Sequence, residues 1–388
     1  MQYIFSDKAS HSETGIFARL TEKKALLTAK GIKTYDLYIG TPDFPPPGHI
    51  IDAVVKAAQK PENYKYALVD MPEMLDALVK YYKKRYGVEI THSEAVSVHG
   101  SQDGIGHLGL ALCNPEDVVL LPDPGYPVFE AGVKLSGAKI YYYKLLKENK
   151  FLPDIKQIPQ EILEKTKYMI VSYPSNPCGA VAPKEMYKEL IAYAKKYNFF
   201  IVNDNAYSDI VFDGREGYSF LSIEGAKEVG IEFFSLSKSF DTTGARISFA
   251  VGNKNIIDAI KVIRSQYDFG MFLPVQYGAI AALTGETQSV REQCEEYRKR
   301  RDALCGGFRR YGWEVPYSEG TMFVWAPIPK KYKSSEEFWE VMLERTGVIC
   351  TPGNAFGPAG EGYVRFALVK PEKELEEISR IIGESNIL

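Results

Sequence analysis

A short hydroxyl-rich stretch, Ser-Leu-Ser-Lys at residues 235–238 with Gly-Ala-Arg at 244–246, lies between two apolar runs of this chain. The runs at 231–234 and 246–251 are typical of buried strands. Lysine is rarely buried unless it is paired or used chemically, and desolvation lowers its pKa, which frees the amine to attack a carbonyl. Nearby hydroxyls and an arginine suit a phosphate. Lys238 is therefore interpreted as a Schiff-base lysine of a pyridoxal phosphate (PLP) site, with a surface loop lysine as the alternative.

Strand-like and helix-like segments alternate through the middle of the chain. We expect strands at 96–98, 118–121, 140–143, 169–171 and 199–202, with helices near 102–112 and after Pro183. Such alternation favours βαβ units and a mainly parallel sheet. In the last third, 322–325 and 364–368 are typical of strands, and Leu375, Ile378 and Ile382 recur at helical spacing. The sequence therefore predicts an α/β protein with a large domain and a smaller α+β domain.

Charge and cysteine content exclude several classes of protein. The chain has 388 residues, with 47 basic and 50 acidic side chains and a net charge of −3, which argues against nucleic-acid binding by bulk charge. Its five cysteines form no CxxC pair, so we expect reduced thiols in a cytoplasmic protein. No apolar run reaches the roughly 18 residues that span a bilayer, and the N-terminus does not resemble a secretory signal. The five histidines show no metal-ligand spacing, and we expect no metal.

Several candidate site residues lie at or just past the ends of predicted strands, where open α/β sheets bind ligands. Asp204 follows four apolar residues, and Ser101 and Gln102 follow Gly100 between a strand and a helix, whose free N–H groups favour an anion. Arg365 alternates with apolar residues in a strand, where its planar fork suits a carboxylate. Each has a structural alternative: a turn aspartate, a capping serine and a structural salt bridge.

Together these segments resemble a known family. The Ser-Leu-Ser-Lys motif with an arginine eight residues after the lysine, and Asp-Asn-Ala-Tyr at 204–207 followed by Ser-Asp-Ile, are similar to the signatures of PLP-dependent aminotransferases of class I/II. The second segment is similar to the one found in LL-diaminopimelate aminotransferases and their close relatives. The resemblance extends over roughly residues 36–382. It implies PLP-dependent transferase fold type I, with a large PLP-binding domain at 45–285 and a small domain formed by both termini, 1–44 and 286–388.

The resemblance also assigns roles to individual residues. It implies that Lys238 carries the cofactor and moves the substrate proton, that Asp204 pairs with the pyridinium nitrogen, and that Tyr207 and Asn176 bind the ring's 3′ oxygen. Tyr126 would stack on the ring. The phosphate would be held by Ser101, Gln102, Ser235, Ser237, Arg246 and, from a neighbouring subunit of a homodimer, Tyr66. The substrate carboxylate would be bound by Arg365, Asn176 and the backbone at Gly40.

Two departures from the family pattern affect substrate choice. Cys178 stands where threonine is frequent, and Ala245 stands where tryptophan or another bulky residue is common. Neither removes a catalytic group. No second arginine is committed by the sequence to a dicarboxylic side chain, although Arg264 and the stretch 268–270 lie in a plausible region.

The resemblance implies an amino acid aminotransferase that moves an amino group to a 2-oxo acid by ping-pong kinetics, on LL-diaminopimelate or an aspartate-like substrate. One alternative is a cystathionine β-lyase-type C–S lyase, which uses the same residues around the ring. Another is a regulator with this fold behind a winged-helix DNA-binding domain. About 35 residues precede the start of the fold, too few for such a domain, and the charge of the chain does not favour it.

Overall fold

The computed structural model describes residue 6, residues 16–29 and residues 31–388. The chain forms two compact units. The large unit comprises Pro42–Arg298 and Glu319–Thr321. The small unit comprises the described part of Met1–Thr41 together with Lys299–Ser318 and Met322–Leu388. The expected division into 45–285 against 1–44 and 286–388 stays a prediction.

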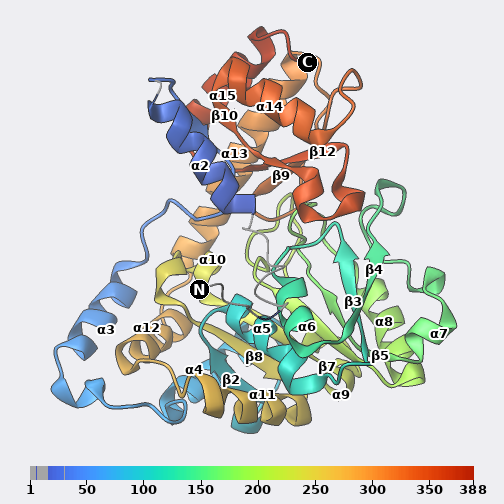
Figure 1. Ribbon diagram of the computed structural model, residues 1–388. Coiled ribbons are helices and arrows are strands. Elements are labelled where there is room, and N and C mark those ends of the chain that lie inside the picture. Colours follow the sequence, from blue (N-terminus) through green and yellow to red (C-terminus); the bar gives the residue numbers. More distant parts are fainter. Residues whose placement is uncertain (1–5, 7–15, 30) are drawn as a thin grey trace, which may run out of the picture. The chain divides into compact units, whose positions relative to one another are not determined.

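A seven-stranded sheet forms the centre of the large unit (Figure 1). Its strands are β2 (Ala95–Val98), β3 (Val118–Asp123), β4 (Lys139–Lys144), β5 (Thr166–Val171), β6 (Phe200–Asn205), β7 (Gly230–Ser235) and β8 (Ser248–Gly252). They lie in the order β2-β8-β7-β6-β5-β3-β4. The neighbours from β7 to β4 pair in parallel, whereas β8 is antiparallel to both β7 and β2. Each predicted strand of the middle region is present, so the predicted mainly parallel α/β sheet is confirmed.

Helices cover both faces of this sheet, because the strands are apolar on both sides. Alternate residues of one strand, such as Val119 and Leu120 of β3, belong to different core clusters. One cluster includes side chains from α4 (Pro72–Tyr86), α8 (Lys184–Tyr197) and α12 (Leu273–Thr284). The other includes side chains from α5 (Ser101–Leu112), α6 (Phe129–Ser136) and α11 (Lys254–Tyr267). Sheets buried on both faces are the rule for parallel strands that crossover helices connect.

Further short or peripheral helices complete the large unit. They are α3 (Gly48–Ala58), α7 (Gln160–Leu163), α9 (Ala226–Val229) and α10 (Leu236–Ser239). The helix predicted near 102–112 is α5, and the one predicted after Pro183 is α8, with Pro183 as its N-cap residue. A proline before the first turn costs no helical hydrogen bond.

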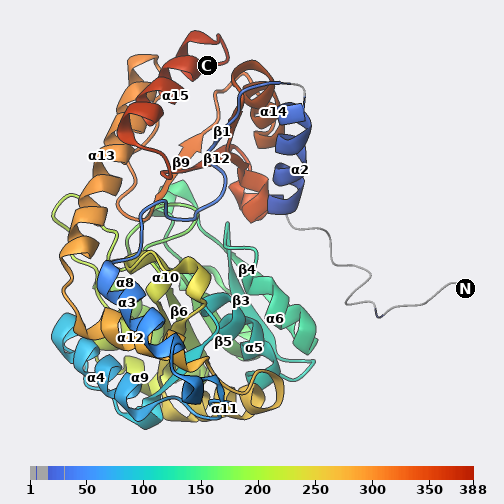
Figure 2. The same cartoon turned by 90° about the vertical axis from the view of Figure 1, so that its left-hand side faces the viewer.

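The small unit has two short sheets with helices beside them (Figure 2). Strand β1 (Tyr35–Asp36) pairs in parallel with β10 (Val348–Ile349), and β11 (Thr351–Pro352), β12 (Tyr363–Ala367) and β9 (Phe323–Pro327) form an antiparallel sheet. The helices are α2 (Ile16–Ala29), α14 (Ser335–Thr346) and α15 (Glu372–Glu384). Helix α13 (Gln288–Arg310) starts in the large unit and ends in the small one. In the part of the chain described, no helix is long and apolar enough to cross a membrane.

Candidate active site

The sheet topology gathers most of the predicted site residues at one edge. Strands β2, β3, β5, β6 and β7 point the same way, so their carboxyl ends share an edge, and the antiparallel β8 begins there. Ser235 at the end of β7 and Val98 at the end of β2 both pair with Ser248, the first residue of β8. Most of the predicted residues of the large unit lie at or just past these ends, and Arg246 precedes the start of β8. This edge is where parallel sheets bind ligands.

Lys238 lies in α10, a single helical turn directly after β7. Ser235 is the N-cap residue of that turn, and its hydroxyl accepts a hydrogen bond from the Ser237 backbone N–H at 3.1 Å. Both serines are buried, and Lys238 is half-buried. The lysine is therefore held on a capped helical turn at the sheet edge, whereas the alternative interpretation was a lysine in a surface loop.

Three of the predicted phosphate residues, Ser101, Gln102 and Arg246, lie at or beside the start of α5. Its N-cap residue is Gly100, so the serine next to it is not an ordinary N-cap serine. Gly100 has a left-handed backbone (φ 87°), and a Cβ there would overlap the guanidinium of Arg246. Ser101 begins the helix and contacts Ser248 at 3.2 Å between the two Oγ atoms, while Gln102 is exposed. We call this arrangement the Gly100 cradle. It combines the N-terminus of α5, the Arg246 guanidinium and nearby hydroxyls around a glycine that cannot carry a side chain, and these groups suit an anion.

Arg246 reaches this cradle from the turn before β8. Its own backbone is left-handed (φ 54°), an uncommon conformation for a residue with a side chain. The guanidinium donates to the Thr243 carbonyl at 3.0 Å and to the His99 carbonyl at 3.4 Å. The rest of the side chain is exposed. The strained backbone of Arg246 directs its guanidinium toward the N-terminus of α5. Backbone strain of this kind is concentrated at functional sites.

Asp204 is the second-to-last residue of β6, and it is 7% exposed. Its Oδ1 is buried and has no hydrogen-bond partner among the described residues. Burial raises the pKa of this carboxyl to about 7, and the charge of Lys238 acts against that rise. A buried carboxylate without a donor is costly. The site therefore lacks one cationic hydrogen-bond donor, which a protonated pyridine nitrogen would provide.

The remaining residues predicted to contact the ring lie just after strands that end at the same edge. Tyr207 follows β6, and Asn176 follows β5; the two side chains are 6% and 8% exposed. Tyr126 follows β3, is half-buried and contacts Phe129 edge-on. Cys178 is also buried, and burial raises the pKa of its thiol. All five cysteines are free.

Sequence reasoning did not single out Asp209, which joins two of these segments. Its Oδ1 accepts from Nε and Nη2 of Arg85 in α4 at 3.1 and 3.0 Å, and its Oδ2 accepts from the Ser239 hydroxyl at 2.7 Å. Ser239 is adjacent to Lys238, and Asp209 lies two residues after Tyr207. The available signal was an acidic residue within the Tyr-Ser-Asp-Ile stretch, but its two partners come from distant parts of the sequence.

Arg365 and Gly40 lie in the small unit. Arg365, in β12, is 2% exposed; its Nη2 donates to the Tyr38 carbonyl at 2.8 Å, and its guanidinium lies over the ring of Phe323 at 4.1 Å. A Cβ at Gly40 would overlap the same ring. The small unit therefore brings Arg365 and the backbone of Gly40 around one phenylalanine. An arginine so deeply buried is expected to bind an anion.

Tyr66, by contrast, is on the surface of the large unit. It is 85% exposed, and its ring contacts that of Phe269 with centroids 5.5 Å apart. Arg264, which lies in the region considered for a dicarboxylic substrate side chain, is only 4% exposed. Its Nε donates to both carboxylate oxygens of Asp268, so Arg264 is committed to an internal ion pair.

These residues fit PLP in three respects. The Gly100 cradle suits a phosphate, the orphaned oxygen of Asp204 suits a protonated ring nitrogen, and Lys238 supplies an amine between them along the sheet edge. The donor set thus matches the cofactor that the sequence predicts.

Comparisons with known proteins agree with this fit. The family model for aminotransferase class I and II matches residues 32–382. The chain is 42% identical to the LL-diaminopimelate aminotransferase of Dehalococcoides mccartyi, over 93% of this chain and 94% of that protein. It is 41% identical to the enzyme of the same name from Halothermothrix orenii, over 98% of both.

Solved structures give the same result. The substrate-bound BacF structure from Bacillus subtilis has a TM-score of 0.96 and 34% identity, covering 99% of this chain and 98% of that one. A Thermus thermophilus aspartate aminotransferase single mutant has a TM-score of 0.91 and 28% identity, covering 99% and 100%. These proteins are aminotransferases or have their fold, and nothing in the comparisons favours the C–S lyase alternative. The chain therefore belongs to the class I and II aminotransferases, a family of PLP-dependent enzymes.

Proposed function

We propose that this aminotransferase uses LL-diaminopimelate as an amino donor and a 2-oxo acid as acceptor, by ping-pong kinetics. The proposal for the donor is supported by relatives of that name at 42%, 41% and 40% identity, which this chain matches over 93%, 98% and 95% of its length. The observation that carries the chemistry is the buried, unpartnered Oδ1 of Asp204 on the same sheet edge as Lys238. Such an arrangement has a clear use only when a protonated ring nitrogen completes it.

Pyridoxal phosphate, when bound, supplies an electron-poor ring that stores the electron pair left at the substrate's α-carbon. Asp204 holds a proton on the ring nitrogen, because its burial makes a lone carboxylate unfavourable and an ion pair favourable. Lys238 Nζ would take the proton from the substrate's α-carbon. Tyr207 and Asn176, both buried, would donate to the 3′ oxygen, and Tyr126 would stack on the ring.

The phosphate and the substrate carboxylate are held by separate groups. The start of α5 at Ser101 and Gln102 provides N–H groups for the phosphate. The other groups assigned to it are Ser235, Ser237, Arg246 and, from a second subunit, Tyr66. Arg365 provides the cation for the substrate carboxylate, with Asn176 and the backbone of Gly40 as further donors; its burial strengthens a bidentate pair. These assignments are part of the proposal.

We assign a homodimer to this enzyme as well. In the large unit, Tyr66 (85%), Val69 (77%) and Leu68 (65%) are highly exposed apolar side chains in one stretch. The Tyr64 ring contacts Phe272, and the Tyr66 ring contacts Phe269, so the stretch joins further exposed aromatics. Contiguous exposed apolar surface of this kind marks an interaction site.

We also propose a cytoplasmic location, because a reducing compartment suits five free thiols.

Mixing two inactive variants tests the shared site. Lys238→Ala lacks the amine, and Tyr66→Ala lacks the ring that would reach the neighbouring site. If Tyr66 acts in the partner's site, a heterodimer contains one site with both residues intact, and mixing restores activity. Activity that stays absent in a mixture proven to exchange subunits would contradict the proposal, as would a monomer by light scattering.

The donor is tested by visible absorbance of the PLP-loaded enzyme mixed singly with amino acids, without an oxo acid. We expect the yellow band to be lost fastest with LL-diaminopimelate. A faster loss with aspartate or an aromatic amino acid would replace the proposed donor. A band that persists while pyruvate accumulates from cystathionine would identify a lyase. A protein that takes up no PLP would overturn the site.

A further inference from the structure

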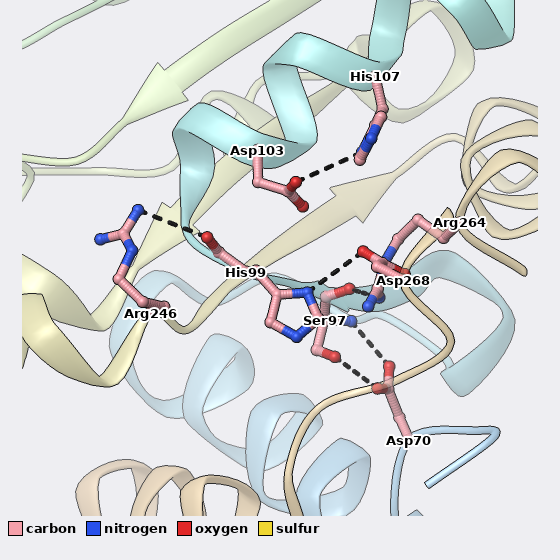
Figure 3. A network of polar contacts seen from close by, with 8 residues as sticks. All are labelled: Asp70, Ser97, His99, Asp103, His107, Arg246, Arg264 and Asp268. Carbon is pink, nitrogen blue, oxygen red and sulfur yellow. Dashed lines mark hydrogen bonds and ion pairs between the residues drawn. The ribbon is translucent and has the colours of Figure 1, made fainter. Parts of the chain in front are cut away.

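A network of charged residues in the large unit holds strand β2 just before the proposed phosphate cradle (Figure 3). Asp70 accepts from the backbone N–H of Ser97 at 2.7 Å and from the Ser97 hydroxyl. The Ser97 carbonyl accepts from Nη1 of Arg264. The donor and acceptor groups of Ser97 that face away from the β8 ladder are therefore fixed by side chains of opposite charge, one from the loop before α4 and one from α11.

Asp268 is the centre of this network. It ends α11, where its backbone N–H donates to the Arg264 carbonyl at 3.0 Å. Its two oxygens accept from Arg264 Nε at 3.2 and 3.0 Å, and Oδ2 also contacts His99 Nδ1 at 3.2 Å. The carboxylate thus lies between a guanidinium that is 4% exposed and an imidazole.

The grouping of His99, Asp103 and Asp268 has the residue types of a metal site. The guanidinium of Arg264, however, already pairs with both oxygens of Asp268 and would repel a second cation. Asp103 lies 3.7 Å from His107, on the helix side of the group. The charges therefore favour an ion-pair network that holds the backbone in place, and they do not favour a metal site.

His99 connects this network to the cradle. Its ring is held by Asp268, and its carbonyl accepts from Nη2 of Arg246 at 3.4 Å. The next residue is Gly100, the left-handed N-cap of α5. Fixing His99 at both its side chain and its carbonyl therefore fixes the direction of the first N–H groups of α5 and the place of the Arg246 guanidinium.

From this geometry we infer that Asp268 is a positioning residue for the cofactor's phosphate, acting through His99 and Arg264 rather than by contact. The inference rests on the proposed function, because it takes the Gly100 cradle as the phosphate site. Within the described part of the chain, the hydrogen bonds of Asp268 run to Arg264 of α11 and to His99, and not to Asp204 or Lys238. Loss of the Asp268 charge should therefore weaken binding of the phosphate and leave binding of the ring unchanged.

The test compares PLP with pyridoxal, which lacks the phosphate, on the full-length cofactor-free protein. For Asp268→Asn we expect the Kd of PLP to rise by about tenfold, the scale of one lost charge-assisted interaction, while the Kd of pyridoxal stays the same. Asp76→Asn is the matched control, because Asp76 forms an exposed pair with His92 at 2.8 Å in the same unit. It should change neither Kd.

Two substitutions at His99 keep the test usable if Asp268→Asn folds poorly, since they retain the Arg264 ion pair. His99→Ala should lose the preference for PLP over pyridoxal, and His99→Asn, whose amide can donate to Asp268, should keep most of it. Equal losses for both ligands would show a merely structural role and overturn the inference, as would an unchanged preference in Asp268→Asn and His99→Ala. If Arg246→Ala also leaves the preference unchanged, the phosphate site itself is wrong.

Discussion

Two buried carboxylates on neighbouring strands, Glu232 and Asp204, differ in how many hydrogen-bond donors the protein gives them. Glu232 in β7 accepts from four donors: the Tyr82 hydroxyl, the Ser219 hydroxyl, the Phe220 N–H and the Asn205 amide. Asp204, at the end of β6, has a buried oxygen with no partner among the described residues. Burial raises the pKa of both groups, but hydrogen bonds act against that rise at Glu232, and only the charge of Lys238 does so at Asp204.

We propose that this difference distinguishes a structural carboxylate, Glu232, from a functional one, Asp204. Burial alone does not mark a catalytic group, since Glu232 is fully buried and its hydrogen-bonding needs are met within the protein. Asp204 is comparably buried, but its Oδ1 has no donor among the described residues, and this uncompensated cost lies at the edge where parallel sheets bind ligands. We therefore expect loss of Asp204 to affect activity and loss of Glu232 to affect stability.

Asp204→Asn should have the largest effect on activity. It removes the charge that we propose keeps the ring nitrogen protonated, so transamination should fall by about 10²–10³-fold, the scale of a lost preorganised electrostatic interaction. The cofactor-free protein should be as stable as wild type or more so, because an uncompensated buried carboxyl is gone. Steady-state kinetics and urea unfolding measure both. An active or strongly destabilised variant would remove the contrast with Glu232.

Glu232→Ala should give the reverse pattern. Four donors lose their acceptor, so the free energy of unfolding should fall by roughly 2–4 kcal/mol. Activity per folded molecule should change far less than in Asp204→Asn. Glu232→Gln, which keeps an acceptor oxygen, serves as the milder control in the same urea titration. A loss of activity per folded molecule as large as that of Asp204→Asn, with no loss of stability, would reverse the two roles.

Asp209→Asn should fall between these two patterns. Its side chain is 5% exposed and satisfied like Glu232, but its partner Ser239 adjoins Lys238. We expect unfolding free energy to fall by roughly 1–3 kcal/mol because the Arg85 pair is weakened. We also expect slower loss of the yellow band on mixing with donor, by stopped-flow absorbance. A stability loss with unchanged kinetics would show that Asp209 only supports the core.

A pH dependence of stability should be the smallest effect. In the cofactor-free protein the pKa of Asp204 is about 7, against 3.8 for an ordinary aspartate. Between these values the folded state holds a proton that the unfolded state releases, so this group makes stability fall as pH rises from about 4 to about 7. Urea unfolding across that range should show a shallower fall in Asp204→Asn. Identical slopes would mean that Asp204 is not protonated in the folded protein.

The sequence predicted the strands and the local motifs because both depend on neighbouring residues. The apolar runs around Lys238 and Asp204 mark β7 and β6, and the hydroxyl-rich stretch marks the lysine turn. The family resemblance supplied roles that periodicity cannot supply.

Contacts between distant segments were beyond sequence reasoning. Asp209 meets Arg85 across 124 residues, and His99 meets Asp268 across 169. Arg264 lies in a plausible region of the sequence for a second substrate arginine, but the fold pairs it with Asp268. The antiparallel direction of β8, which brings Arg246 to the site edge, also follows from pairing that no local pattern reveals.

The central claim, that a ring nitrogen completes Asp204, is tested most directly by ¹⁵N NMR of the enzyme loaded with ring-¹⁵N-labelled PLP. We expect the chemical shift of a protonated nitrogen at neutral pH in the wild type and in Glu232→Gln. In Asp204→Asn we expect the shift of an unprotonated nitrogen. The same protonated shift in all three proteins, or an unprotonated nitrogen in the wild type, would contradict the account.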